Sequence, residues 1–424
     1  MKDKRSAIWG WSLYDWANSA FATTVMAGFF PVFFKAYWSA GESVQQSTFY
    51  LGLANSIASI IVAALAPILG AIADKGSAKK KFLSVFAFLG ILMTGALWFV
   101  RQGHWQMAAL FYAIGTVGFA GGNIFYDSLL PGVASPKKVD FVSSLGFALG
   151  YIGGGLLFAV NVFMYLKPEV FGIADGAVAI KLSFLSVAVW WAVFSIPLMI
   201  FVKEPEGDKG LSAADAVRAG WNQLKSTMKE VRHLKVVGMF LLAYWFYIDG
   251  VDTIIKMAVD YGVALGFPSE SLIVALLLVQ FVAFPAALLY NLFAKKIGVK
   301  KALFVAIFAY GIITVLGFLM KTVMHFYALA IAIGLFQGGI QALSRSYYTR
   351  LIPENKAAEF FGFFNMLGKF ATIMGPLLLG IVTLITGNNR YGILSILLLF
   401  MAGGVLLLKV DEKEGKRIAD EYLS

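Results

Sequence analysis

Long apolar stretches dominate this sequence and recur at short intervals along it. A helix that crosses a bilayer needs about 20 apolar residues, and twelve segments reach that length, with bounds near 10–38, 48–72, 82–101, 105–130, 140–166, 179–202, 236–265, 269–293, 302–320, 325–350, 357–386 and 389–409. With 59% hydrophobic and 14% charged residues, the chain has more apolar surface than a soluble domain can bury. The sequence therefore predicts an all-α, multi-pass membrane protein with the lipid bilayer as its main partner.

Basic residues concentrate in alternate connections between these spans. The basic connections are Lys2, Lys4 and Arg5; Lys75, Lys79, Lys80 and Lys81; Lys137 and Lys138; the long central loop; Lys295, Lys296, Lys300 and Lys301; and the C-terminal tail. Cytoplasmic loops of membrane proteins carry this excess of lysine and arginine. Both termini are therefore predicted to be cytoplasmic, and the net charge of +11 needs no nucleic-acid partner to account for it.

The residue types that usually carry cofactor or metal chemistry are scarce. The chain has no cysteine, which excludes disulfides, thiolate catalysis and cysteine-based metal sites. Its three histidines, His104, His233 and His325, lie at predicted loops or helix ends without the spacing of metal ligands. No metal, cofactor or enzymatic activity is expected, and the absence of a phosphate-binding loop argues against direct ATP drive.

A polar stretch divides the apolar spans into two groups of six. We predict an N-terminal half over 1–202, a cytoplasmic linker over 203–235, a C-terminal half over 236–409 and a cytoplasmic tail over 410–424. Within the linker, apolar side chains recur every three or four residues at Val217, Trp221, Leu224, Met228 and Val231, which predicts an amphipathic helix on the membrane surface.

The two halves are related by an internal repeat. A shift of 222 residues places the Leu-Leu-Pro that ends at Pro131 on the Leu-Ile-Pro that ends at Pro353. The same shift pairs Tyr126 with Tyr348, Gly146 with Gly368, Gly153 with Gly375, and Asn123 with Arg345. Two halves of six spans in like orientation are the plan of the major facilitator superfamily of transporters.

Seven charged residues lie inside the predicted spans. They are Asp15, Asp127, Asp249, Asp252, Lys256, Arg345 and Lys369. A charge within a membrane helix costs roughly 2.5–3.5 kcal/mol on insertion scales, so it is expected to face a water-filled path, a partner charge or a substrate. In the superfamily plan, the first, fourth, seventh and tenth helices line a central cavity, and all of these residues except Lys369 fall on those helices.

Helical spacing groups polar residues with these charges on shared faces. Asp249, Asp252 and Lys256 share one face, Asn123 shares another with Asp127, and Gln341 shares a third with Arg345. The predicted substrate-binding residues are Tyr14, Asn18, Asn123, Asp249, Gln341, Arg345 and Lys369. The residues predicted to act in proton coupling or gating are Asp15, Asp74, Asp127, Asp252 and Lys256. The alternative is that the charges pair with one another and hold the bundle together, as in a possible ion pair of Asp252 with Lys256.

Asp74 belongs to a different pattern. It lies with Lys75, Lys79 and Lys80 in the turn between the second and third spans, which resembles the cytoplasmic loop signature of the superfamily. The resemblance implies a latch that favours the outward-open state. The second half has Ala294 near the equivalent place, so such a latch is asymmetric, and a plain loop anchor is the alternative.

Three stretches resemble one branch of the superfamily. One is Trp11–Phe21 with Phe125–Pro131; the second runs from Gly339–Tyr348 through Glu359–Gly362 to Gly375 and Pro376; and the third is Phe246–Gly250 with Thr253. They resemble the "unknown major facilitator" family, which is related to the fungal autophagy-linked vacuole effluxers. The resemblance implies that Tyr14, Asp15, Asn18, Asp249, Arg345 and Lys369 belong to a shared transport pathway, and fungal relatives are associated with release of amino acids from the vacuole.

The sequence thus favours a monomeric secondary transporter in a bacterial cytoplasmic membrane. It is predicted to move a small polar or zwitterionic solute, such as an amino acid, a short peptide or a cell-wall-derived metabolite, by alternating access, with protons as a candidate coupling ion. A transporter of lysolipids or other amphiphiles and a non-transporting membrane sensor remain as alternatives. The direction of transport is left open.

Overall fold

The computed structural model describes residues 2–42, 44–76, 78–204, 222 and 235–421, and all regular structure in this part of the chain is helical. The long elements of the N-terminal half are α1 (Arg5–Ala20), which continues through η1 (Phe21–Phe29), α2 (Phe30–Phe33) and η2 (Phe34–Trp38), then α3 (Val44–Gly76), α4 (Lys79–Ala96), α5 (Trp105–Val133), α6 (Val139–Leu166) and α7 (Gly176–Phe201). Short 3-10 turns follow α4 and α6 at η3 (Leu97–Phe99) and η4 (Pro168–Phe171).

The C-terminal half repeats this arrangement. Its elements are α9 (Lys235–Ala264), α10 (Ser269–Ile297), α11 (Val299–Leu319), α12 (Val323–Thr349), η5 (Glu354–Lys356), α13 (Ala357–Thr386), α14 (Asn389–Ser395), α15 (Leu397–Leu408) and the tail helix α16 (Glu412–Glu421). The amphipathic helix predicted over 217–231 lies outside the described residues.

Most of these helices have the length and composition of membrane spans. Among the described residues, ten helical runs are long and apolar enough to cross a bilayer. Two further helices, α3 and α13, contain shorter apolar stretches at Leu53–Ala66 and Met374–Thr383. Each of the twelve predicted segments coincides with one of these elements, which is consistent with the predicted twelve-helix, two-half architecture.

The outer surface of the bundle is apolar, as a bilayer requires. On α4, for example, Val85, Phe88 and Leu92 leave 63%, 65% and 50% of their surface exposed. A water-soluble protein rarely exposes a continuous apolar surface of this kind. Helices also satisfy their backbone hydrogen bonds internally, which hydrocarbon demands of any spanning segment. The protein is therefore a multi-pass membrane protein.

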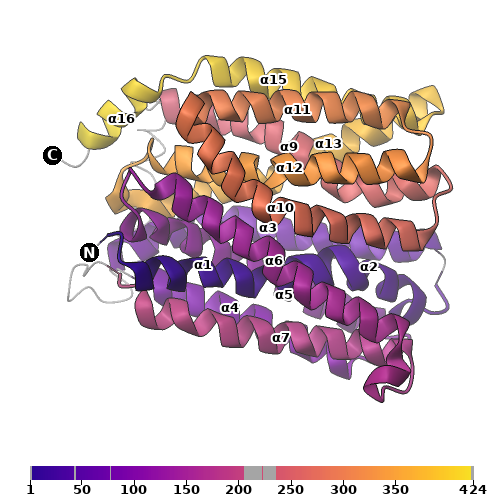
Figure 1. Ribbon diagram of the computed structural model, residues 1–424. Coiled ribbons are helices and arrows are strands. Elements are labelled where there is room, and N and C mark those ends of the chain that lie inside the picture. The colour runs from indigo at the N-terminus through magenta and orange to yellow at the C-terminus, as the bar shows by residue number, and fades with distance from the viewer. Residues whose placement is uncertain (1, 43, 77, 205–221, 223–234, 422–424) are drawn as a thin grey trace.

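Each half has its own apolar core. One cluster of buried residues runs from Ala7 to Val202 and is joined by Ala358, and the other runs from Val237 to Val410. Figure 1 shows the two halves side by side, with both termini at the same end of the bundle. We call this the basic end, because Lys79–Lys81 and Lys295–Lys301 lie there, and the opposite one the far end. The halves meet where α3 packs against α13 and α6 against α10.

The first span is wound unusually over its second part. η1 and η2 are π-helical, and the short α2 between them has Pro31 near its start. π-helical winding is rare and is frequent at functional sites. Here it occupies the part of the first span that leads to the far end.

A lysine near the start of the third helix of each half holds the end of that half's last helix. Lys80 Nζ donates hydrogen bonds to the carbonyls of Met199 and Val202 at 2.7 Å each. In the C-terminal half, Lys300 Nζ donates to the carbonyls of Leu408 at 3.0 Å and Val410 at 2.7 Å. The last carbonyls of a helix lack intrahelical partners and carry partial negative charge, which a lysine satisfies. We call these two contacts the lysine clasps.

Candidate functional site

One buried arginine joins the two halves near the basic end. Arg345 on α12 lies with Nη1 3.0 Å from Asp127 Oδ1 on α5 and with Nη2 3.4 Å from Asp15 Oδ2 on α1. Arg345 is 3% exposed, and the two aspartates are 7% and 8% exposed. Three charges that lie on separate predicted spans, more than 300 residues apart at the extremes, thus form one ion-pair cluster.

The remaining donors of Arg345 bind α6. Its Nε donates to Ser143 Oγ and its Nη2 to the Ser143 carbonyl, both at 2.9 Å. Ser143 Oγ in turn donates to the carbonyl of Ala342, one turn before Arg345. The guanidinium carbon also lies 4.8 Å from the ring of Trp11 and 4.2 Å from that of Phe147. The guanidinium is therefore held on all sides by residues of the N-terminal half.

Asp15 is fixed by an aromatic pair as well as by Arg345. Tyr126 donates its hydroxyl to Asp15 Oδ2 at 2.7 Å, and Trp11 Nε1 donates to the carbonyl of Tyr126 at 2.9 Å. The rings of Trp11 and Tyr126 stack with centroids 4.3 Å apart. Gly146 on α6 leaves room for this arrangement, because a Cβ there would lie 2.5 Å from Asp15 Oδ2.

The cluster holds two carboxylates and one guanidinium. Asn365 Nδ2 on α13 donates to Asp127 Oδ2 at 3.4 Å, but it carries no charge. Among the side chains that the structure describes, ionisation of both carboxylates leaves the cluster with one negative charge in excess in a buried place. A buried uncompensated charge is costly, so this arrangement favours uptake of one positive charge.

Neutral amide side chains lie one helical turn further toward the far end. Asn123 precedes Asp127 by four residues and Gln341 precedes Arg345 by four, so each lies about 6 Å along its helix from the charged cluster. Asn18 Nδ2 donates to Asn123 Oδ1 at 2.6 Å, which joins α1 to α5. We call Asn18, Asn123 and Gln341 the amide layer.

Tyr151 connects the amide layer across the two halves. Its hydroxyl on α6 donates to Gln341 Oε1 on α12 at 2.6 Å. One turn beyond, Gln337 is 7% exposed, and its Oε1 has no hydrogen-bond partner among the described residues. A buried amide oxygen without a partner is unfavourable unless another molecule supplies a donor. The layer above the charged cluster thus offers neutral hydrogen-bonding groups from both halves.

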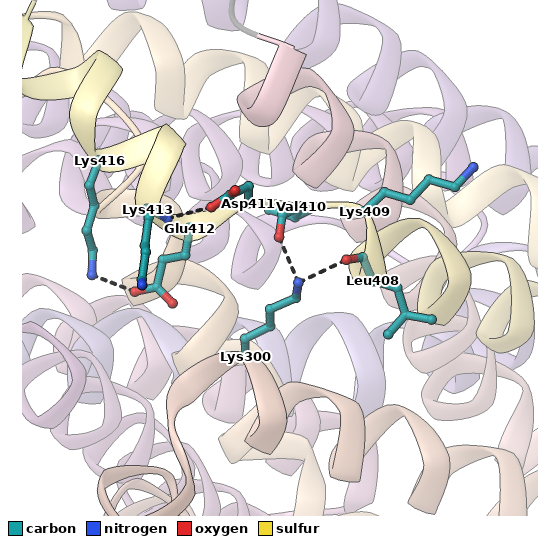
Figure 2. A pocket seen from close by; sticks show the side chains of 8 residues that line it. All are labelled: Lys300, Leu408, Lys409, Val410, Asp411, Glu412, Lys413 and Lys416. Atoms are coloured by element: carbon teal, nitrogen blue, oxygen red, sulfur yellow. Dashed lines mark hydrogen bonds and ion pairs between the residues drawn. The ribbon is translucent and has the colours of Figure 1, made fainter.

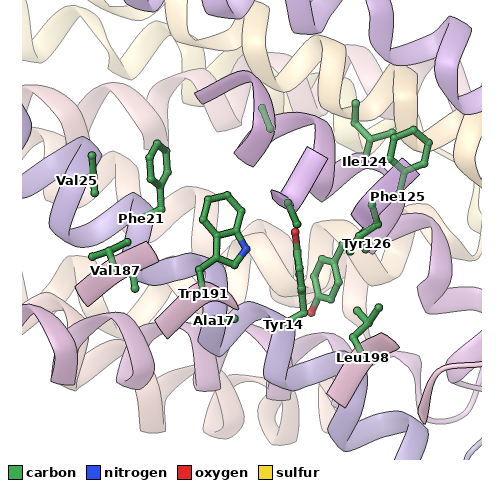
Figure 3. Packing of buried hydrophobic residues seen from close by; sticks show 14 of the residues in the cluster. Tyr14, Ala17, Phe21, Val25, Ile124, Phe125, Tyr126, Val187, Trp191 and Leu198 are labelled. Carbon is green, nitrogen blue, oxygen red and sulfur yellow. The ribbon is translucent and has the colours of Figure 1, made fainter. Parts of the chain in front are cut away.

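Tyr14 lies deeper inside the N-terminal half than the sequence predicted. Figure 3 shows its ring between those of Trp191 and Tyr126, and the centroids of Tyr14 and Tyr126 are 5.1 Å apart. The side chain is completely buried, and its hydroxyl has no hydrogen-bond partner among the described residues. Tyr14 therefore packs within the apolar core of the N-terminal half, four residues before Asn18 on the same helix.

Asp249 joins two helices of the C-terminal half. Both of its carboxylate oxygens accept the backbone N–H of Gly375 on α13, at 2.9 and 3.0 Å, and Thr253 Oγ1 donates to Oδ1 at 3.2 Å. Pro376 follows directly and interrupts the hydrogen bonding of α13. The carboxylate is 1% exposed. We call this contact the α9–α13 junction.

The other predicted residues lie apart from the charged cluster or cannot be placed. Asp252 is half-buried on α9, and Lys256, one turn further toward the far end, is exposed. Lys369 on α13 and Asp74 near the end of α3 have side chains outside the described part of the structure. The structure therefore brings together Asp15, Asp127 and Arg345 from the predicted set, with Asn18, Asn123 and Gln341 one turn away.

A second set of ion pairs joins the halves at the surface of the basic end. Arg350, directly after α12, pairs with Asp140 at the start of α6, and its Nη1 lies 3.8 Å from Glu412 on the tail helix. Lys2 Nζ lies 2.6 Å from Glu354 Oε2. The two halves are thus closed against each other at this end by charges in two successive layers.

Three residues that take part in these contacts, Asp140, Ser143 and Arg350, were not recognised in the sequence. Asp140 and Arg350 stand at the ends of predicted spans, where a charge normally faces water. Ser143 carries no charge, and a serine within a membrane helix most often bonds its own backbone. The available signal was position in the sequence: Ser143 follows Asp140 by three residues, and Arg350 follows Arg345 by five.

Comparison with known proteins agrees with this architecture. The family model described as "Vacuole effluxer Atg22 like" matches residues 3–420. An uncharacterized MFS-type transporter, YxiO of Bacillus subtilis, is 41% identical over 97% of this chain and 96% of its own. Autophagy-related protein 22 of Saccharomyces cerevisiae is 27% identical over 87% of this chain and 78% of its own.

Solved structures share the fold at low sequence identity. The human organic anion transporter MFSD10 superposes with a TM-score of 0.72 at 14% identity, covering 96% of this chain and all of that one. The proton:xylose symporter XylE gives 0.68 at 15% identity, covering 97% of this chain and 96% of its own. These relatives are transporters rather than enzymes. The chain belongs to the Atg22-like vacuole effluxer family and is a transporter of the major facilitator superfamily.

Proposed function

We propose that the protein is a secondary active transporter that moves a small polar or zwitterionic solute by alternating access, with protons as the coupling ion. The observation that carries this proposal is the bridge from Arg345 on α12 to Asp15, Asp127 and Ser143 on three helices of the other half. We assign this bridge as the gate on the basic side. The positive-inside distribution of lysine and arginine supports a cytoplasmic location for that side and for both termini.

Alternating access requires two halves that can separate at one end without unfolding. Each half here has its own apolar core, and at the basic end the contacts described above are ion pairs and hydrogen bonds. Water can replace polar contacts of this kind when the halves part. The gate is therefore separable, while the core of each half moves as a unit.

The charge balance of the gate supports proton coupling. Two buried carboxylates share one guanidinium, so a proton on Asp15 or Asp127 neutralises the excess charge and strengthens closure. Loss of that proton to the cytoplasm favours opening, because repulsion between the carboxylates is then uncompensated. Asp252 and Lys256 lie outside this cluster, toward the far end, and are assigned to proton coupling or gating in that part of the transport path. Asp74 is assigned as a latch on the cytoplasmic surface.

The solute is assigned to the space above the gate. The amide layer, with Tyr151 beside it, presents hydrogen-bond donors and acceptors from both halves, which suits a small polar molecule. Arg345 is already held by two carboxylates and Ser143, so in this state it closes the path rather than binding a solute carboxylate. Lys369 and Asp249 in the C-terminal half remain proposed contacts for the charged groups of a zwitterion. Tyr14 is assigned to the support of Asn18 from the side of the basic end.

The proposed solutes are amino acids, short peptides and cell-wall-derived metabolites. The proposed setting is a bacterial cytoplasmic membrane with the protein as a monomer. The homologue from Bacillus subtilis supports a bacterial setting, since it is similar over nearly the whole of both chains.

The test is solute-driven proton movement in proteoliposomes that contain a trapped pH dye. The panel consists of amino acids, short peptides and muropeptide fragments, each added to wild type, Asp127→Asn and the matched control Glu169→Gln at an exposed far-end position. We expect one solute class to move protons with wild type and the control, and Asp127→Asn to move the solute without protons. Solute movement with no proton signal in wild type would refute the coupling but leave transport standing.

Failure of the whole panel points to the two alternatives. Lysolipids added to the same vesicles test transport of amphiphiles. Binding of a panel solute by equilibrium dialysis without any flux would instead identify a sensor and refute transport.

A further inference from the structure

A basic hollow lies at the basic end of the C-terminal half, away from the gate. Its volume is about 640 Å³, and it is lined by Lys300, Lys409, Lys413 and Lys416 together with Asp411 and Glu412. Figure 2 shows Lys300 between the end of α15 on one side and the start of α16 on the other. The lining has two more positive than negative side chains.

Both acidic residues of the hollow are already bound. Asp411 Oδ1 accepts the backbone N–H groups of Lys413 and Glu414 at 2.9 and 3.2 Å. Glu412 Oε1 lies 2.6 Å from Lys416 Nζ and 3.8 Å from Arg350 Nη1. The charge of Glu412 is thus offset by Lys416 and Arg350, whereas Asp411 caps the start of the tail helix and keeps its negative charge.

Two of the four lysines are available to a ligand. Lys409 and Lys413 are exposed, and neither side chain makes a hydrogen bond or ion pair within the described residues. Lys300 is held by the carbonyls of Leu408 and Val410. The hollow therefore has one fixed ammonium group, that of Lys300, and two lysines with free side chains on either side of it, Lys409 pointing away in Figure 2. Their combined positive charge attracts an anion.

The N-terminal half shows what occupies the equivalent place. Glu204 follows Val202 by two residues, and its carboxylate accepts the backbone N–H groups of Lys79 at 2.6 Å and Lys80 at 3.2 Å. The first lysine clasp thus carries an anion supplied by the chain itself.

The second lysine clasp lacks this anion. Glu412 follows Val410 by two residues, as Glu204 follows Val202, but it turns to Lys416 and Arg350. Among the described residues, no side chain accepts the backbone N–H groups of Val299 and Lys300, the counterparts of Lys79 and Lys80. The place that a carboxylate fills in one half is thus an open basic hollow in the other.

An apolar strip on the membrane-facing surface leads into this hollow. Leu398, Met401, Val405 and Leu408 of α15 recur at spacings of three and four residues and expose 59%, 59%, 56% and 65% of their surface. Leu408 also lines the hollow. A molecule with a long apolar part and an anionic head fits both features at once.

We propose that the hollow binds the phosphate headgroup of an anionic phospholipid from the leaflet at the basic end, with an acyl chain along the α15 strip. Lys409 and Lys413 contact the phosphate, and Lys300 supplies the fixed positive charge beneath it. The inference does not depend on which solute the protein transports.

The test is titration of the detergent-purified full chain with phosphatidylglycerol, with bound lipid counted by native mass spectrometry. The variant is Lys409→Ala/Lys413→Ala, because neither side chain holds the fold. Each lysine near an anionic lipid strengthens binding about fivefold, so we expect the double variant to bind about 25-fold more weakly. The charge-keeping variant Lys409→Arg/Lys413→Arg is expected to bind as wild type does.

The matched control is Lys81→Ala/Lys137→Ala, which removes two exposed lysines elsewhere at the same end. This control variant should bind phosphatidylglycerol at the hollow as tightly as wild type does. Equal weakening in both alanine variants would mean general surface charge and would overturn the proposal, as would wild-type binding in Lys409→Ala/Lys413→Ala. Inorganic phosphate that binds the hollow as tightly as phosphatidylglycerol would overturn the assignment to a lipid.

Discussion

Arg345 Nη1 lies 3.0 Å from Asp127 Oδ1, and this contact between α12 and α5 closes one half of the transporter on the other. Both residues are buried, and Asp15 and Ser143 complete the surroundings of the guanidinium. If these four residues form the proposed gate, they contribute both to the stability of this closed arrangement and to the ease with which it opens.

Replacement of Arg345 is expected to destabilise the closed state strongly. Arg345→Ala leaves two buried carboxylates without a cation, and loss of one partner of a buried pair costs about 3–5 kcal/mol. Arg345→Lys should recover part of this loss, because one ammonium group cannot reproduce the planar fork that reaches Asp15, Asp127 and Ser143. Thermal unfolding in detergent, with Arg101→Ala at an exposed far-end position as control, measures the difference. An unchanged midpoint in Arg345→Ala would contradict the gate assignment.

Opening of the gate can be observed directly because the chain has no cysteine. Spin labels on cysteines introduced at Lys137 and Lys301 report the distance between the two halves at the basic end. In Asp15→Asn, one excess negative charge is removed, so we expect the short distance to be more populated at pH 8 than in wild type. A label pair at Lys81 and Lys137, within one half, should not change.

Gly375 is expected to tolerate no side chain. A Cβ at this position would lie 1.9 Å from Thr253 Oγ1 and 2.7 Å from Asp249 Oδ1. Gly375→Ala therefore disrupts the α9–α13 junction, at a cost of about 1–3 kcal/mol for the steric conflict alone. Gly380→Ala on the same helix is the control, because a Cβ there meets nothing within 4 Å. Thermal unfolding should show a lower midpoint for the first variant, a wild-type midpoint for the second and partial recovery in Thr253→Ala/Gly375→Ala.

The two lysine clasps should contribute equally and independently. Lys80→Met and Lys300→Met keep the apolar stem of the side chain and remove two hydrogen bonds to a helix end. Hydrogen bonds from a charged group contribute about 1.5–3 kcal/mol each at most, less here because both lysines are partly exposed. Since the clasps lie in different halves, the loss in the double variant should be the sum of the two. A double variant no less stable than either single one would show that the halves unfold in separate steps.

The N-terminal segment should detach at acidic pH. The backbone N–H of Ser135 donates to Asp3 Oδ1 at 3.0 Å and, with Lys138 at 3.8 Å, holds the pKa of Asp3 below the usual value of an aspartate. A depressed pKa contributes stability above the unfolded value, and this contribution is lost as the pH falls through the folded value. The midpoint difference between wild type and Asp3→Ala, less than about 1 kcal/mol for an exposed pair, should therefore be constant from pH 5 to 8 and shrink below pH 4. Lys138→Ala should have a smaller effect, because Ser135 is the main partner.

Sequence patterns were sufficient for the helices but not for the contacts between them. The predicted segment 357–386 coincides with α13, and 389–409 with α14 and α15, because apolar length is a property of each segment alone. Helical spacing also placed Asn123 with Asp127 and Gln341 with Arg345 on shared faces. These relations depend on one helix at a time, so a single sequence contains them.

The partners of the charged residues depend on how the halves pack. Nothing in the spacing of α6 marks Ser143 as the partner of Arg345, and Asp140 and Arg350 look like ordinary span-end charges. The 222-residue repeat places Gly153 on Gly375, and each packs closely on the first helix of its own half, against Trp16 and Thr253 respectively. The repeat therefore predicts packing within each half, whereas the gate lies between halves, where the repeat has no equivalent.

The π-helical winding of the first span allows part of that helix to rotate its side chains about the helix axis. In η1 and η2 the backbone hydrogen bonds join residues five apart, whereas in an α-helix they join residues four apart. A change from one winding to the other therefore moves each N–H to a neighbouring carbonyl and keeps the segment helical. A change of register by one residue turns the side chains it passes by about 100° around the axis. Phe21, Thr24 and Phe29, which are now buried, would then turn away from the core, and adjacent residues of the same helix would take their buried positions. The first span can thus present a different surface at the far end while Asp15, on the α-helical part, stays in its ion pair.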